Sequence, residues 1–125
     1  MDENALSKMI IGAAIEVHKQ LGPGLLESAY EHALAYEFTL RDIPCARQKP
    51  APVVYKGVHL DCDFRLDFLV GELVVLELKS VDTLLPVHEA QVITYLKLTG
   101  CKLGLLLNFN VKLMRDGIKR IAYNL

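Results

Sequence analysis

The chain has 125 residues, of which 52% are hydrophobic and 23% charged, and its formal net charge is −1. These values are typical of one globular domain, which we expect over residues 1–125, and no apolar run approaches the roughly 20 residues of a membrane-spanning helix. The near-neutral charge argues against a broad basic surface for nucleic acid, although clustered Lys and Arg or a bound metal would supply positive charge locally. The polar first residues do not resemble a secretory signal, so we expect a cytoplasmic protein with no membrane partner.

The three cysteines, Cys45, Cys62 and Cys101, are widely spaced and form no Cys-x-x-Cys pair. This spacing disfavours a zinc knuckle or a disulfide framework, and three thiols are fewer than the four that usually hold an iron–sulfur cluster. We therefore expect reduced thiols that are mostly buried.

The first third of the chain is predicted to form two amphipathic helices. Apolar residues recur at three- and four-residue steps over residues 4–20, and a second apolar stripe runs from about residue 25 to residue 41. The Gly-Pro-Gly of residues 22–24 separates them. Because it lacks the spacing and the Lys-Ser/Thr of a phosphate-binding loop, we interpret it as a turn. The Ile-Pro of residues 43–44 ends the second helix.

The middle of the chain is predicted to form strands. Residues 52–55 and 58–60 are typical of a hairpin with its turn at residues 56–57. Residues 61–68 alternate polar and apolar side chains, which indicates a half-buried strand. Its core-facing side chains should be Cys62, Phe64, Leu66 and Phe68.

A buried strand, a helix and another buried strand complete the predicted core. A turn at residues 70–73 leads into an almost wholly apolar strand that ends at residue 79. Residues 86–99 are predicted to be helical, with a proline suited to the first turn and a glycine just past the end. Residues 102–109 form the next strand. Because the helix crosses over between these two strands, we expect them to be parallel.

The tail is predicted to be a hairpin with its turn at Asp116-Gly117. The predicted order of elements is therefore α-α-β-β-β-α-β-β, with the last strands in a hairpin. This order gives an α/β fold with a mixed β-sheet flanked by helices.

Glu77 and Lys79 are the most informative residues because they interrupt a strand that is otherwise apolar. At positions i and i+2 of a strand, their side chains point to the same face. Burying a carboxylate and an ammonium is costly unless the charges pair or hold a metal. The two residues therefore indicate either a structural ion pair or a metal-assisted active site, and the spacing alone supports the ion pair at least as well.

Asp67 would complete a metal site if it met Glu77 across the hairpin that joins their strands. A simple two-residue turn would place the two carboxylates on opposite faces of the sheet. Convergence requires a loop of odd length, such as residues 71–73, or a bulge. Two converging carboxylates and the backbone carbonyl of Leu78 would suit Mg²⁺ or Mn²⁺. Lys79 would then stabilise transition-state charge or position the attacking water.

The predicted third helix carries His88, Gln91 and Tyr95 on one face. Gln91 and Tyr95 offer hydrogen bonds and an aromatic surface to a phosphate or a base, although a solvated face explains the same spacing. Glu27, near the start of the second helix, is a further carboxylate, and the helix macrodipole alone would favour it there.

Residues 24–30 read Gly-Leu-Leu-Glu-Ser-Ala-Tyr, which is the pattern Gly-x-x-Glu-x-x-Tyr ending in Tyr30. With this segment the chain resembles the small bacterial GxxExxY proteins, and the likeness runs from about residue 11 to residue 121. The other matching segments are residues 48–50, 55–58, 67–70, 77–80, 88–91, 95–97 and 108–109.

The GxxExxY proteins are placed in the PD-(D/E)XK nuclease-like superfamily. The resemblance therefore implies a restriction-endonuclease-like core and a metal-dependent nuclease that acts on nucleic acid, with DNA favoured. It implies that Asp67 matches the motif aspartate and that Glu77 and Lys79 match the (D/E)-x-K pair. The residue before Asp67 is Leu66 rather than the proline of the motif, which is frequently absent in the superfamily.

The resemblance also implies the roles of the remaining residues. Gln91 and Tyr95 match the Gln-x-x-x-Tyr element of RecB-like nucleases, and Glu27 corresponds to the first-helix glutamate that often completes the site. We expect Asp67, Glu77, Lys79 and Glu27 to be catalytic. We expect the metal ligands to be Asp67, Glu77, Glu27 and the Leu78 carbonyl, and the substrate-binding residues to be Gln91, Tyr95 and Tyr30.

Three functions are consistent with the sequence. The first is the metal-dependent nuclease. The second is a non-catalytic nucleic-acid-binding or assembly module on the same fold, which the near-neutral charge and the small size favour. A homodimer or a partner protein would then supply specificity. The third is a hydrolase of a smaller phosphate ester that uses the same site.

Overall fold

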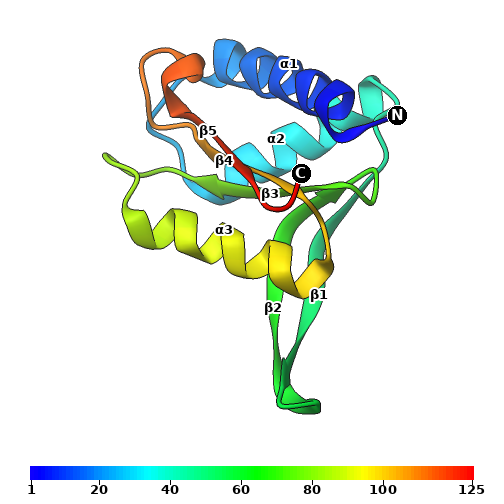
Figure 1. Ribbon diagram of the computed structural model, residues 1–125. Coiled ribbons are helices and arrows are strands. Elements are labelled where there is room, and N and C mark those ends of the chain that lie inside the picture. The colour runs from blue at the N-terminus through cyan, green and yellow to red at the C-terminus, as the bar shows by residue number, and fades with distance from the viewer.

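A five-stranded sheet lies between two layers of helices (Figure 1). The computed structural model describes the backbone of residues 1–125 and every side chain except that of Asp63. Helices α1 (Glu3–Leu21) and α2 (Glu27–Leu40) cover one face of the sheet, and α3 (Pro86–Thr99) covers the other. Within this described part of the chain, none of the helices is both long and apolar enough to cross a lipid bilayer.

The strands lie side by side in the order in which they occur in the sequence. They are β1 (Cys45–Tyr55), β2 (Val58–Val70), β3 (Val74–Lys79), β4 (Leu103–Asn108) and β5 (Ile118–Ala122). β3 and β4 are parallel, because α3 crosses over between them, and the other neighbouring pairs are antiparallel. The predicted α/β fold with a mixed sheet is confirmed.

The interior of the sheet is formed by β3 and β4, whose apolar runs are buried on both faces. On the side of α1 and α2, the core includes Phe38 and Phe68, whose rings meet edge to face. On the side of α3, a smaller core includes Val92 and Leu106. A strand with two buried faces has little room for charge, so Glu77 in β3 is an exception that needs a physical reason.

The predicted ends of α3 are confirmed. Pro86 is its first residue, and Gly100 ends it in a left-handed conformation with a φ of 75°. The His88 side chain, which was predicted to share a helix face with Gln91 and Tyr95, is used at the start of the helix instead. Its Nδ1 accepts a hydrogen bond from the Leu85 N–H at 2.9 Å and so caps the start of the helix.

The β1–β2 hairpin continues beyond the sheet as a two-stranded arm of residues 52–62, which projects past α3 in Figure 1. The predicted hairpin turn at its tip is confirmed. Leu66 and Phe68 are buried as predicted, but the prediction was wrong for Cys62 and Phe64, which are exposed. The reason is that the part of β2 nearest the tip of the arm lies beyond the helical layers, although the ring of Phe64 still packs on one side against Tyr95 of α3.

The thiols also differ from the prediction that they are mostly buried. Cys45 and Cys62 are exposed and Cys101 is half-buried, and all three are free. Cys45 begins β1, at the edge of the sheet, and Cys62 lies in the arm, so neither side chain has a core to enter.

The tail forms one strand rather than a separate hairpin. Residues Met114–Gly117 make a short 3-10 helix, η1, so the predicted turn at Asp116-Gly117 is wrong. β5 follows directly and pairs with β4. The terminal hairpin is therefore β4–β5 with η1 in its connection, and β5 completes the edge of the sheet.

Gly117, the last residue of η1, lies directly against the end of β4. A β-carbon at this position would overlap the backbone oxygen of Asn108, and a backbone atom in a buried strand has little freedom to move aside. Gly117→Ala should therefore lower the free energy of unfolding by about 2–3 kcal/mol, as overpacked sites do. Urea unfolding followed by circular dichroism measures this loss.

Gly12→Ala is the matched control in the same experiment. Its β-carbon would meet only the end of the flexible Arg41 side chain, at 3.3 Å, and alanine favours the α1 helix. This variant should equal the wild type or exceed its stability by up to about 1 kcal/mol. Equal stabilities for Gly117→Ala and the wild type would contradict the packing argument.

Candidate active site

β2 and β3 separate at one end, and we call the opening between them the fork. The two strands are paired through residues 68–70 and 74–76, on either side of a turn at residues 71–73. One step further in this register, Asp67 lies opposite Glu77. The three-residue turn is the odd-length connection that convergence of the two carboxylates requires.

Each carboxylate accepts a backbone hydrogen bond across the fork. The Asp67 N–H donates to Glu77 Oε1 at 3.2 Å, and the Leu78 N–H donates to Asp67 Oδ2 at 2.8 Å. In a strand, the N–H and C=O of one residue point to the same side, so the Leu78 carbonyl also faces β2. The fork therefore brings together the two carboxylates and the carbonyl that the sequence singled out.

Burial and mutual repulsion disfavour two negative charges in the fork. Glu77 is only 4% exposed. Burial, followed by the neighbouring Asp67 charge, raises the pKa of Glu77 to about 8. Burial also raises the pKa of Asp67, with a further contribution from the Glu31 carboxylate. A divalent cation would reverse this situation, because its charge favours the ionised form of both carboxylates.

Lys79 and two residues of α3 form one wall of the fork. Lys79 Nζ lies 3.5 Å from Gln91 Oε1. None of the ion pairs between described side chains joins Lys79 to Glu77, so the simple structural ion pair is not what the fork contains. Tyr95 is buried and its ring packs against Phe64. Burial, and then the two carboxylates, raise the pKa of Tyr95 to about 12, so it stays a neutral hydrogen-bond donor.

Helix α2 forms the opposite wall. A pocket of about 270 Å³ lies between α2 and the fork. It is lined by Glu27, Ser28, Glu31, Gln48, Asp67 and Leu78. Glu27 is exposed, whereas Glu31, one turn further along the helix, is half-buried and acts on the pKa of Asp67. The glutamate expected from the sequence lines the pocket, and a second glutamate is more closely coupled to the fork.

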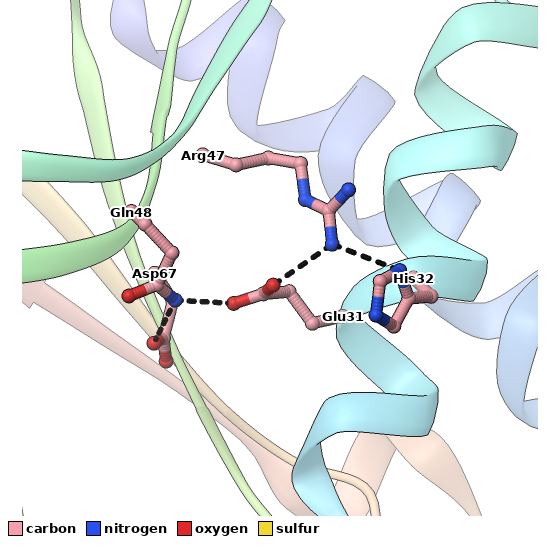
Figure 2. Close-up of polar contacts among 5 residues, drawn as sticks. All are labelled: Glu31, His32, Arg47, Gln48 and Asp67. Carbon is pink, nitrogen blue, oxygen red and sulfur yellow. Dashed lines mark hydrogen bonds and ion pairs between the residues drawn. The ribbon is translucent and has the colours of Figure 1, made fainter.

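Two residues of β1 hold the Glu31 carboxylate (Figure 2). Gln48 Nε2 donates to Glu31 Oε1 at 2.5 Å, and Arg47 Nη2 donates to Glu31 Oε2 at 2.9 Å. The same Gln48 nitrogen lies 3.4 Å from Asp67 Oδ1, and Arg47 Nη2 also lies 3.1 Å from His32 Nδ1. This polar network connects α2 to the fork.

Tyr30 has a structural role, and its burial argues against the prediction that it binds substrate. Its side chain is fully buried and its ring stacks on that of Phe109. Its hydroxyl donates to the Gly22 oxygen at 2.6 Å and accepts from the Leu25 N–H at 3.1 Å. The hydroxyl is therefore used inside the protein, where it fixes the turn that positions Glu27 at the start of α2.

Side chains to which the sequence alone assigns no role also hold the site. The Ser80 hydroxyl, just past β3, donates to the Leu25 oxygen at 2.6 Å. The buried Asn108 side chain makes hydrogen bonds to the N–H and the oxygen of Val81, at 3.1 and 2.9 Å. Glu31 was visible as a residue one turn from Glu27 on the same helix face. Asn108 and Gln48 lie in segments that match the GxxExxY proteins, but their contacts join distant parts of the chain, so no local pattern indicates what they bind.

The residues of the fork fit a divalent cation. Among the described residues, no group of three or more His, Cys, Asp or Glu side chains is placed to hold a metal by itself. Mg²⁺, however, is usually held by one or two carboxylates and keeps several waters. Asp67 and Glu77 supply two carboxylates, and the Leu78 carbonyl supplies a neutral oxygen. The raised pKa values of the pair indicate that it lacks a full counter-charge.

Comparison with known proteins places the chain in a family. A sequence model of the PD-(D/E)XK nuclease superfamily matches residues 4–121, nearly the whole chain. The chain belongs to this superfamily. Its α/β architecture is consistent with the restriction-endonuclease-like fold, and PD-(D/E)XK nucleases are generally dependent on a divalent metal. No curated protein and no solved structure matches the chain.

The stability of the metal-free protein should fall as the pH rises through the titration range of Glu77. The pKa of Glu77 is about 8 in the folded protein, against an ordinary value of 4.5. The folded state therefore holds a proton that the unfolded chain has already lost. The resulting stabilisation is complete below pH 4.5 and is lost as the pH rises to about 8, at up to about 1.4 kcal/mol per pH unit.

Urea unfolding of the metal-free protein across this pH range measures the slope, and Glu77→Gln tests its origin. The amide keeps the size of the side chain and does not titrate, so the variant should show a flatter dependence and exceed the wild type at high pH. Glu72→Gln, in the exposed neighbouring turn, is the control and should keep the wild-type slope. A wild-type slope in Glu77→Gln would show that Glu77 is not the titrating group.

Proposed function

We propose that this protein is a metal-dependent nuclease that hydrolyses the phosphodiester bonds of nucleic acid, with DNA as the favoured substrate. The observation that carries the proposal is the convergence of Asp67 and Glu77 in the fork, with Lys79 two residues beyond Glu77. Membership of the PD-(D/E)XK nuclease superfamily supports the reaction class. The resemblance to restriction-endonuclease-like and RecB-like nucleases supports DNA.

Asp67, Glu77 and the Leu78 carbonyl would hold Mg²⁺ or Mn²⁺, with Glu27 assisting directly or through water. When bound, the cation would neutralise phosphate charge and lower the pKa of a water molecule. The Lys79 ammonium, half-buried beside the pair, would stabilise the negative charge that develops on the phosphate. Burial strengthens this attraction, since less water screens it.

Gln91 and Tyr95 would complete the α3 wall of the site. Gln91 accepts from Lys79 and so orients the ammonium, and its amide N–H groups can donate to a phosphate oxygen. Tyr95 keeps its phenolic proton and can act as a further donor. We also infer that the chain is one of the GxxExxY proteins, because the tyrosine of that signature, Tyr30, fixes the turn that presents Glu27.

Lys79→Ala should reduce cleavage by at least about 100-fold, because it removes a charge that acts on the transition state. Asp67→Asn and Glu77→Gln should do the same by weakening the hold on the cation. The measurement is Mn²⁺-dependent cleavage of end-labelled single-stranded DNA, double-stranded DNA and RNA, with circular dichroism to verify the fold of each variant.

Lys112→Ala, which removes an exposed lysine outside the site, is the control and should cleave like the wild type. Undiminished cleavage by Asp67→Asn or Glu77→Gln would overturn the proposal. Adding simple nucleotides and phosphate esters to the substrate panel distinguishes a nuclease from a hydrolase of smaller esters.

The arm favours a second candidate function, an assembly module that works as a homodimer. Its exposed large apolar side chains are Val54, Tyr55, Val58 and Leu60. An isolated two-stranded ribbon is only marginally stable in water, so an apolar ribbon of this kind would be stabilised by burial against another surface. A second copy of the chain would provide one, and the net charge of −1 gives little repulsion against self-association.

The free edge of β2 adds a geometric reason for a second copy. β2 pairs with β3 only through residues 68–70, so in the described structure residues 58–66 have a strand neighbour on one side alone. Antiparallel pairing of this edge with the same edge of another copy would create a two-fold axis, the commonest symmetry of oligomers. The dimer would place two forks in one particle.

Tyr55→Ser combined with Val58→Thr should convert a wild-type dimer to a monomer without unfolding it. Sedimentation velocity over a range of concentrations measures the oligomeric state. Val87→Thr, which changes an exposed valine of α3 outside the arm, is the control and should remain dimeric. A wild type that stays monomeric at every concentration would contradict the homodimer.

A further inference from the structure

Gln48 lies in the middle of β1 with a backbone conformation that residues other than glycine rarely adopt. Its φ is 48°, in the left-handed region. The residues on either side of it pair with β2 in the same register, so no residue is inserted at this point. The strain is therefore local to Gln48, at the position that faces Asp67. Strained residues cluster at functional sites, where the surrounding structure must hold them.

The Gln48 side chain bridges two carboxylates from different elements (Figure 2). Its Nε2 donates to Glu31 Oε1 on α2 at 2.5 Å and lies 3.4 Å from Asp67 Oδ1 on β2. The amide must present its NH₂ group here, because an ionised carboxylate only accepts hydrogen bonds. One neutral group thus holds two like charges in a shared orientation.

We propose that Gln48 is a positioning residue of the site: its left-handed backbone directs the amide between Glu31 and Asp67, and the bridge holds both carboxylates toward the pocket. This inference rests on the proposed function, since the carboxylates are prepared for the cation of that same site. Gln48 itself need not touch the cation or the substrate.

The bridge leaves the carboxylates able to bind a cation. Asp67 accepts from Gln48 at one oxygen and from the Leu78 N–H at the other, and Glu31 accepts from Gln48 and Arg47. A carboxylate has about four lone-pair positions, so each retains about two of them. The hydrogen bonds therefore fix the direction of the groups without saturating them.

Asparagine separates the backbone role of Gln48 from its side-chain role. Asparagine tolerates the left-handed region better than glutamine does, which offsets the loss of the bridge, so Gln48→Asn should melt close to the wild-type temperature. Its side chain is one methylene shorter and should not span Glu31 and Asp67. If Gln48 positions the carboxylates, the variant should fold well and yet have a defective site.

Calorimetric titration with Mn²⁺ alone gives the first measurement. Gln48→Asn should bind Mn²⁺ about 10- to 100-fold more weakly, the loss typical of residues that orient metal ligands. In cleavage assays kcat should fall by a similar factor while KM for the oligonucleotide stays near the wild-type value. Gln48→Met, which keeps the length of the side chain without its donors, should show the same losses.

Glu72→Asn is the matched control. Glu72 also has a left-handed backbone, with a φ of 62°, but its side chain is exposed in the turn between β2 and β3. The substitution should leave the affinity for Mn²⁺ and kcat unchanged. Wild-type affinity and kcat in both Gln48→Asn and Gln48→Met would overturn the positioning role.

A double-mutant cycle in the metal-free protein keeps the inference separate from the proposed function. If Gln48 bridges to Glu31, the shifts in Tm caused by Gln48→Met and Glu31→Met should not add in the double variant. Additive shifts would overturn the bridge. A wild type that neither binds Mn²⁺ nor cleaves nucleic acid would overturn the proposed function, and the cycle would still decide whether Gln48 couples the carboxylates.

Discussion

The confinement of two carboxyl groups, one buried and one half-buried, in a single poorly solvated fork is the constraint on which the site depends. Asp67 and Glu77 face each other at the end of a strand that is otherwise apolar, and burial denies them the solvation that charges need. Each is compensated in part by a backbone N–H of the opposite strand. The remaining free-energy cost of burying these groups is offset by the two hydrophobic cores, which pack against both faces of β3 and keep the strand in place.

A turn and a few side-chain hydrogen bonds around the fork, which we call the frame, determine the positions of α2 and α3 relative to it. The turn at residues 71–73 determines the side to which the carboxylates point, and Tyr30 and Ser80 tie the turn before α2 to the end of β3. Asn108 holds the chain that leaves β3. The Ser80 side chain is short and those of Tyr30 and Asn108 are buried, so these hydrogen bonds hold their partners in fixed positions. They place α2 and α3 on either side of the fork without adding charge to it.

The sequence predicts this frame unevenly, for physical reasons. β3 and α3 were predictable because an apolar run, a proline and a glycine are local signals. The turn at residues 71–73 was open to two lengths, and only the paired strands decide between them. Cys62 was misjudged because alternation tells which side chains share a face and not what covers that face. Glu31 and Gln48 meet across 17 residues and depend on a left-handed backbone, which no periodicity reveals.

The charges around the fork also bear on whether the cation or the nucleic acid would bind first in the proposed nuclease. The α2 wall and the fork contribute carboxylates, and the Arg47 guanidinium is already paired with Glu31. These carboxylates oppose the approach of a polyanion, since like charges brought together in a poorly solvated site cost several kcal/mol. If the protein is the proposed nuclease, a phosphodiester would approach only after a cation had neutralised the pair, or together with it. An apolar residue in place of Glu77 would make a more stable metal-free protein, so the acidic fork is a cost to folding that binding of the proposed cation would offset.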